Sequence, residues 1–238
     1  DELLREFFST LDKKYRGNVG LMGGWAVYYT LKDKGTMHMG SRDIDIFFDT
    51  TKVKASVIEQ KLEEMGFHRH STFRWVKIFH SETEKQLGIE ESKKHALHNL
   101  SYIYFDIATP TKIKHSMLEP LLKKVFAKEK EFIKIKGIEV MVPSPKILVE
   151  MKLKSIPNRN DTFKRTKDIA DLYALLNTNK EIWIVKNGER IKTKGLNSKL
   201  VQNFREKLER FKTDGTIATS ATMLNIGVGR LTSLLEKI

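Results

Sequence analysis

Two aspartates separated by one residue form the pair with the clearest chemical meaning in this 238-residue sequence. Asp43 and Asp45 open a run that alternates polar and apolar residues and then becomes solidly apolar, which predicts a strand entering a core. Side chains alternate between the two faces of a strand, so both carboxylates are predicted to point the same way. The pair therefore predicts a clamp for hard divalent cations. A lone Asp-x-Asp is also common at solvated strand ends, so its context has to decide.

A pair of glycines precedes the acids. Gly23 and Gly24 follow a short apolar run at 18–22 and open the stretch 25–34, which is predicted to be a helix ending at Gly35. Glycines at a helix start let backbone N–H groups approach a phosphate, and the helix N-terminus adds partial positive charge. Taken alone, the glycines also suit an ordinary turn. In the order strand, glycines, helix and acidic strand, they predict a site for nucleotide phosphates.

A third acid lies inside another strand-like run. Alternation over residues 101–109 places Tyr102, Tyr104, Asp106 and Ala108 on one face. Sites with two metal ions need a further carboxylate beside the first pair. We therefore expect Asp106 to ligate a second cation and to help deprotonate an attacking hydroxyl.

The elements that must position these acids change in kind along the chain. About the first 110 residues alternate strand and helix patterns, and the remainder is mainly helical with one or two hairpins. The fold class is therefore predicted as α+β with an α/β-type N-terminal half, divided into a catalytic core at 1–112 and a mainly helical region at 113–238. Helices are predicted at 2–14, 25–34, 52–65, 116–128, 146–156, 162–177, 196–212 and 218–237. Strands are predicted at 18–22, 43–48, 73–80 and 101–109, with hairpins turning at 136–137 and spanning 181–193.

The charge of the chain favours a polyanionic partner. Forty-three Lys and Arg against thirty Asp and Glu give a net charge of +13, which suits RNA, DNA or a nucleotide polyphosphate, although a solvated lysine surface explains it equally well. The chain has no Cys, no apolar run of membrane-spanning length and no secretory signal pattern, so the cytoplasm is the expected location and no membrane partner is expected. Seven scattered histidines without a His-Glu-x-x-His pattern do not predict a zinc site.

The glycines, the run Gly40-Ser-Arg-Asp-Ile-Asp45 and the strand acid Asp106 together resemble the nucleotidyltransferase-fold superfamily, which includes the DNA polymerase beta-like proteins. The resemblance implies a mixed sheet flanked by helices, with the acids on adjacent strands. The segments 143–153 and 165–172 are similar to the abortive-infection branch, which includes nucleotidyltransferase toxins. That similarity implies a toxin-antitoxin-like role and an antitoxin protein as a partner.

The resemblance adds further nucleotide-binding residues. It places Lys152 and the pair Lys167 and Asp168 near the nucleotide, together with the residues flanking the first acids, Ser41 and Arg42. Many relatives carry Gly-Ser where this chain has two glycines, so Ser41 is the expected source of the hydroxyl contact to phosphate. The residues themselves allow a plainer interpretation: a surface lysine at 152, and an Asp168 that pairs with a lysine one helical turn away.

The predicted activity is transfer of a nucleoside monophosphate from a nucleoside triphosphate to a hydroxyl, with Mg²⁺ or Mn²⁺ as cofactor and release of pyrophosphate. The acceptors implied are RNA or tRNA, which the charge favours, a protein, or a small molecule such as an antibiotic. The alternative is an inactive nucleotidyltransferase-like module that binds nucleic acid or a protein partner. A degenerate module would be expected to lose one of the acids, whereas all three are present.

Overall fold

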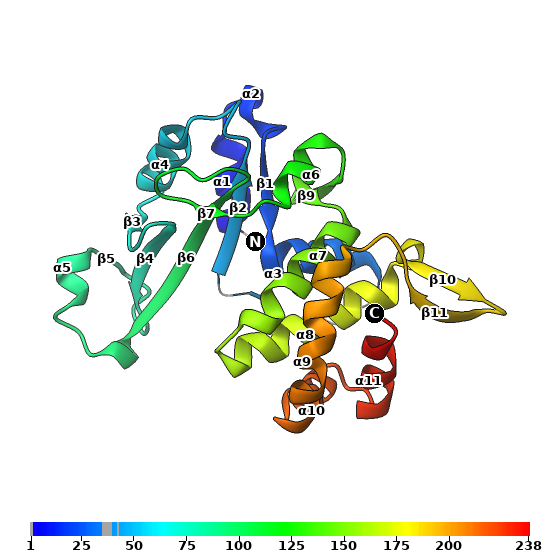
Figure 1. Cartoon of the computed structure of the whole chain (residues 1–238). Coiled ribbons are helices and arrows are strands. Elements are labelled where there is room, and N and C mark those ends of the chain that lie inside the picture. Colours follow the sequence, from blue (N-terminus) through cyan, green and yellow to red (C-terminus); the bar gives the residue numbers. More distant parts are fainter. Residues whose placement is uncertain (1, 35–39, 42) are drawn as a thin grey trace. The chain divides into compact units, whose positions relative to one another are not determined.

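The computed structural model describes residues 2–34, 40–41 and 43–238 (Figure 1). The chain divides into two compact units. The first unit comprises residues 1–26 and 41–143, and the second comprises residues 27–40 and 144–238. Among the described residues, no helix combines the length and the apolarity that crossing a membrane requires.

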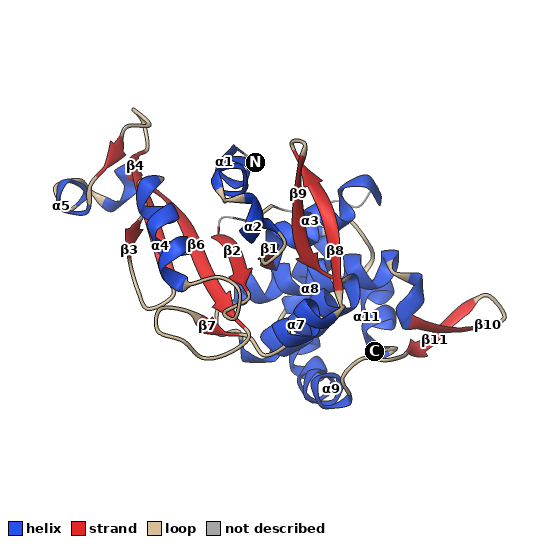
Figure 2. Cartoon of the chain, turned by 90° about the horizontal axis from the view of Figure 1, so that it is seen from above, coloured by secondary structure: helices blue, strands red, loops and turns tan. Residues whose placement is uncertain are grey.

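The first unit is built on one mixed sheet. Its path over the described residues runs β3-β4-β6-β2-β1-β9-β8 (Figure 2). Beside this path, β5 pairs with β4 and β7 pairs with β6. The pairs β2/β6, β1/β9 and β6/β7 are parallel, and β1/β2, β4/β6 and β8/β9 are antiparallel. The strands are β1 (Val19–Met22), β2 (Asp43–Phe48), β3 (His68–Arg69), β4 (Arg74–His80), β5 (Gln86–Leu87), β6 (Leu100–Thr109), β7 (Met117–Leu118), β8 (Lys130–Ile135) and β9 (Ile138–Pro143).

Helices cover this sheet because its strands are apolar on both faces. Phe105 of β6 points away from the aspartate face and packs on Phe7 and Phe67, at 5.4 and 4.9 Å between ring centroids. On the aspartate face, Phe47 of β2 packs on Phe126, at 5.5 Å between ring centroids. The helices of this unit are α1 (Glu2–Thr10), α2 (Lys13–Arg16), α4 (Ala55–Glu64), α5 (Ile89–Ser92) and α6 (Leu122–Ala127), with a 3₁₀ turn at Leu97–Asn99.

The helix α3 (Gly23–Leu31) starts in the first unit and continues into the second, where a 3₁₀ turn (Lys32–Lys34) follows it. The rest of the second unit is mainly helical. Its helices are α7 (Pro145–Ser155), α8 (Thr162–Thr178), α9 (Ser198–Thr213), α10 (Thr216–Met223) and α11 (Val228–Glu236), with 3₁₀ turns at Ile156–Asn158 and Lys180–Ile182. A separate hairpin, β10 (Trp183–Lys186) and β11 (Glu189–Thr193), projects beyond these helices in both views (Figures 1 and 2).

The second unit begins and closes on specific polar contacts. Ser144 caps α7 by accepting a hydrogen bond from the Ile147 N–H, and Pro145 occupies the first helical turn, where its missing N–H costs nothing. Arg165 of α8 is buried and donates through Nη2 to Asp214, at 2.9 Å, just before α10. Such buried, paired groups hold α8 and α10 in one packed unit.

The predicted fold class is confirmed, because a mixed sheet flanked by helices precedes a mainly helical region. Three predicted helices were placed wrongly. Residues 2–14 form α1 and the start of α2, with residues 11–12 outside both helices. Residues 116–128 hold the short strand β7 and only a short helix at Leu122–Ala127, since Pro120 interrupts the pattern. Residues 218–237 form two helices, because Asn225 takes a positive φ of 52° and Gly227 caps the second. The compact units divide at 143 and 144, because β9 pairs with β1 and so ties residues 130–143 to the first sheet. The functional division into a catalytic core at 1–112 and a region at 113–238 stays a prediction.

Candidate active site

Three predicted acids meet on one face of the sheet in the first unit. In the parallel pairing of β2 and β6, Asp45 lies directly opposite Asp106, and Asp43 lies opposite Tyr104. Residues that face one another across a strand pair project to the same side. We call Asp43, Asp45 and Asp106 the acid cluster. Asp106 is buried, whereas Asp43 and Asp45 are half-buried.

A glycine allows the first pair of acids to lie against a helix start. Asp45 is paired with Met22, the last residue of β1, and α3 begins at the next residue, Gly23. Gly23 has a φ of +65°, and a Cβ added there would lie 2.0 Å from Asp45 Oδ2. Only glycine permits both that backbone conformation and that close approach. Gly24 is the second residue of the same helix, so the pair brings a helix N-terminus beside the acid cluster.

An arginine that the sequence did not suggest completes this arrangement. Arg74, the first residue of β4, lies opposite Asp106 in the antiparallel β4/β6 pairing. Its Nε donates to Asp106 Oδ1 at 2.7 Å, and its Nη2 donates to Asp106 Oδ2 at 2.6 Å. The same Nη2 lies 3.6 Å from Asp43 Oδ2, and the guanidinium carbon lies 4.7 Å from the centroid of the Tyr104 ring. Hydrogen bonding to Asp106 raises the pKa of Arg74 above its ordinary value, so the guanidinium stays charged.

The register between β4 and β6 explains why Arg74 was missed. An arginine at the edge of a strand-like run is ordinarily solvated, and the sequence does not state which β6 residue it faces. The available signal was an acid within one strand run together with an arginine at the start of another. That signal becomes specific only when the two runs pair antiparallel.

The donor set suits one divalent cation better than two. Asp43 and Asp45 supply carboxylate oxygens on one face, and carboxylates are ligands that Mg²⁺ and Mn²⁺ prefer. A second cation would need Asp106, but both of its oxygens already accept hydrogen bonds from Arg74. Within the described part of the chain, no group of three or more His, Asp or Glu side chains is arranged to hold a metal ion. Asp43 and Asp45 are the residues that would hold a divalent cation at this site.

The residues flanking the first acids contribute unequally to this picture. Ser41 is half-buried and belongs to the first unit, as do Gly23 and Gly24. Arg42, predicted to bind nucleotide, lies outside the described residues.

The remaining predicted nucleotide-binding residues lie in the second unit, where two of them form a buried ion cluster. Lys152 of α7 donates from Nζ to Asp168 Oδ1 at 2.6 Å and to Asp171 Oδ2 at 2.5 Å. We call these three residues the lysine cluster. Lys167, on the same helix as the two acids, is half-buried. Nucleotide binding by Lys152, Lys167 and Asp168 stays a prediction.

Electrostatics keep the lysine cluster charged in spite of its burial. Burial opposes the charged form of Lys152, but Asp168 and Asp171 outweigh it and raise the pKa of Lys152. Burial likewise opposes ionisation of Asp168, but Lys152 and Arg159 prevail and lower the pKa of Asp168. Arg159 and Ser155 donate to the second oxygen of Asp168, at 2.9 and 3.2 Å. The cluster is thus satisfied by partners inside its own unit.

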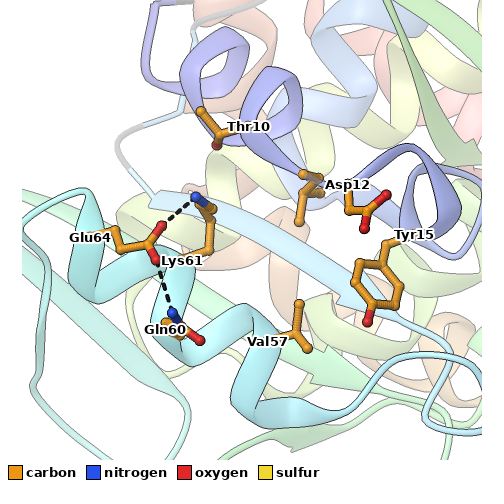
Figure 3. Close-up of a pocket in the computed structure, with 8 residues that line it drawn as sticks. Thr10, Asp12, Tyr15, Val57, Gln60, Lys61 and Glu64 are labelled. Atoms are coloured by element: carbon orange, nitrogen blue, oxygen red, sulfur yellow. Dashed lines mark hydrogen bonds and ion pairs between the residues drawn. The ribbon is translucent and has the colours of Figure 1, made fainter.

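The first unit also contains a hollow. Residues of α1, α2 and α4 surround it, and Gln60 donates to Glu64 at its edge, where Lys61 also pairs with Glu64 (Figure 3). None of the predicted site residues lines it. We assign the hollow no part in nucleotide binding.

Comparison with known proteins gives no family assignment. No protein-family model matches the chain, and no curated protein matches it. Among solved structures, an antigenic nucleotidyltransferase-like protein from Paracoccidioides brasiliensis is similar at 16% identity and a TM-score of 0.46, over 86% of this chain and 84% of that one. The antibiotic-resistance factor ANT(2'')-Ia is similar at 13% identity and a TM-score of 0.46, over 90% of this chain and 92% of that one. Similarity at this level carries no inference about activity, which has to come from the site itself.

Proposed function

We propose that this protein is a metal-dependent nucleotidyltransferase that moves a nucleoside monophosphate from a nucleoside triphosphate to a hydroxyl acceptor. The observation that carries the proposal is the close approach of Gly23 to Asp45, which seats a helix start against an acidic pair that faces Asp106. A turn with a purely structural role does not require a carboxylate in contact with its glycine. A phosphate site needs both a backbone N–H surface and a cation held by acids.

Each part of the site has a distinct task in this proposal. The N-terminus of α3 binds phosphate oxygens through backbone N–H groups and partial positive charge. Asp43 and Asp45 would hold Mg²⁺ or Mn²⁺, which neutralises charge on the triphosphate when bound. Ser41 adds a hydroxyl donor from the first unit. Asp106 pairs with Arg74, and this pairing fixes the positions of both side chains on the face of the acid cluster.

The reaction balances without any further reagent. The acceptor oxygen attacks the α-phosphorus, and a new P–O bond forms as the bond from that phosphorus to the bridging oxygen of pyrophosphate breaks. The acceptor proton passes to a carboxylate of the acid cluster. Holding the hydroxyl and the triphosphate in line supplies much of the rate, because little covalent chemistry is asked of the protein.

RNA, including tRNA, is the acceptor that the charge distribution favours. Residues 144–238 hold nineteen lysines and arginines against ten aspartates and glutamates, so most of the excess positive charge lies in this part of the chain. Exposed basic residues there include Lys199, Arg205 and Lys207 of α9. A dense positive surface binds a phosphate backbone through release of counterions. The toxin role and the antitoxin partner implied by the resemblance stay predictions.

The experiment is a transfer assay with α-phosphate-labelled triphosphates. Each of the four nucleotides is incubated with Mg²⁺ or Mn²⁺ and with purified tRNA, a mixed protein fraction, or aminoglycoside antibiotics in parallel. We expect label in the tRNA fraction, pyrophosphate in equal amount, and no label with Asp45→Asn. Label that appears only in the protein or antibiotic arm would keep the chemistry and replace the acceptor.

A second candidate function rests on a specific contact. Because Arg74 engages both oxygens of Asp106, the same face suits a module that binds nucleotide or RNA without transferring anything. Nucleotide binding without labelled product in any arm of the assay would favour that module.

A further inference from the structure

Arg74 contacts two members of the acid cluster. Its fork contacts both oxygens of Asp106, and Nη2 also approaches Asp43. The ring of Tyr104 lies beneath the guanidinium. The Asp106 side chain is 9% exposed and the Arg74 side chain is 25% exposed. The charge is therefore partly withdrawn from water but still reachable from one side.

This arrangement disagrees with a second divalent ion on Asp106. An arginine fork matches a carboxylate in two parallel hydrogen bonds, which are charge-assisted and among the stronger polar contacts in proteins. A metal ion at Asp106 would have to displace that fork and leave a permanently charged guanidinium beside it. Removing one member of a partly buried pair is costly, because the other is left without compensation.

One nitrogen of the guanidinium is not used on the aspartates. Nε and Nη2 are used on the aspartates, and Nη1 makes no hydrogen bond to any residue in the described parts of the chain. Guanidinium groups bind phosphate oxygens well through two such N–H donors. One edge of the guanidinium can therefore bind a carboxylate while the other edge binds a phosphate.

We propose that Arg74 is the resident cation of this site: it takes the place of a second divalent ion at Asp106 and binds a phosphate oxygen of the triphosphate through Nη1. This inference rests on the proposed function. Asp106 then acts as the positioning residue that orients Arg74. The site works with one divalent ion, held by Asp43 and Asp45, and with one fixed positive charge from the chain.

The test counts manganese ions on the protein with a non-hydrolysable triphosphate analogue bound. Electron paramagnetic resonance of Mn²⁺ gives the number of bound ions, and calorimetry gives the affinity for the analogue. We expect one Mn²⁺ per complex for the unmodified chain. For Arg74→Gln we expect a second bound Mn²⁺ and analogue affinity at least about tenfold weaker.

Two further variants keep the test sharp. Arg74→Lys keeps the charge but loses the fork, so it should hold one Mn²⁺ and bind the analogue with intermediate affinity. Arg69→Gln removes the same charge from β3, where Arg69 pairs with Glu59 at 3.1 Å and contacts Trp75, a residue that faces away from the acid cluster. That control should change neither the ion count nor the affinity. Thermal unfolding of each variant identifies any that fails to fold.

Each outcome decides the inference. Two Mn²⁺ per complex in the unmodified chain, or analogue affinity that is unchanged in both Arg74 variants, overturns it. Either result leaves the proposed function intact if binding still requires metal and Asp45. No analogue binding at all, with or without metal, removes the proposed function and this inference together.

Discussion

The two units each contain a basic side chain set between two aspartates, and the two arrangements differ in exposure. In the first unit, the Arg74 side chain is 25% exposed and uses only part of its donor set on the acids. In the second unit, the Lys152 side chain is 9% exposed and bonds to both of its partners. One cation can still meet a ligand, and the other is enclosed by its own unit.

The difference separates a site from a structural cluster. A buried charge is compatible with a stable fold only while its charged partners stay in place. If one partner is lost, the desolvation cost of the remaining charge is no longer offset. A half-buried charge has a smaller desolvation cost than a fully buried one. It also interacts more strongly with other charges than a fully exposed one does. We therefore expect chemistry at the acid cluster and a contribution to stability from the lysine cluster, whereas nucleotide binding by Lys152 stays a prediction.

The largest expected effect is loss of transfer in the acid cluster. Asp43→Asn or Asp45→Asn should reduce transfer at least about 100-fold, because a neutral amide holds a divalent cation poorly. Unfolding temperature should stay nearly unchanged, since neither acid is part of the apolar core. The assay is labelled transfer with circular dichroism on the same samples. Asp49→Asn, which changes the same charge just beyond the other end of β2, is the matched control. Full activity in either site variant contradicts the assignment of chemistry to this cluster.

Stability should respond most to the lysine cluster. Lys152→Met removes one partner of a buried ion set and should cost about 3–5 kcal/mol of unfolding free energy. Denaturant titration measures it, and Lys207→Met on the exposed side of α9 should cost less than about 0.5 kcal/mol. A Lys152→Met protein that is as stable as the unmodified chain but binds triphosphate poorly would contradict a structural role for Lys152 and support the predicted nucleotide role.

A smaller effect tests the close approach of Gly23 to Asp45. Gly23→Ala places a methyl group against the carboxylate and forces alanine into positive φ, so transfer should fall about tenfold while stability falls by about 1–2 kcal/mol. Gly137→Ala, at a φ of +86° with no atom within 4 Å of the added Cβ, carries the backbone cost without the contact. Equal loss of transfer in both variants would mean that the effect comes from the backbone alone.

The smallest effect concerns acid stability of the second unit. The pKa of Asp168 is lowered from 3.8, so its contribution is present above that pH and is lost as pH falls through its folded value. Asp168→Asn should therefore flatten the fall of the unfolding temperature below about pH 4. Glu181→Gln, at an exposed position, should leave that slope unchanged. If the unfolding temperature falls with pH equally in the unmodified chain, Asp168→Asn and Glu181→Gln, Asp168 is not held ionised by its partners.

Periodicity in the sequence predicted the local elements that carry the acids. The strands of Asp43 and Asp106 and the helix after Gly23 appear where alternation and glycine placement put them. Contacts between distant segments could not be predicted from the sequence. The register that brings Arg74 opposite Asp106, and the pairing of β9 with β1, depend on contacts between distant segments. The burial of Lys152 was missed for the same reason. The sequence of α7 is typical of an exposed basic helix, and only the contacts with α8 bury Lys152.

The central claim is that the acid cluster and the start of α3 form a working nucleotide site. Calorimetric titration of each of the four nucleoside triphosphates, first with Mg²⁺ or Mn²⁺ and then with EDTA, tests it most directly. We expect binding of at least one triphosphate that requires the metal and disappears in Asp45→Asn but not in Asp49→Asn. Binding that persists unchanged in EDTA and in Asp45→Asn, or no binding to any of the four, would contradict the claim.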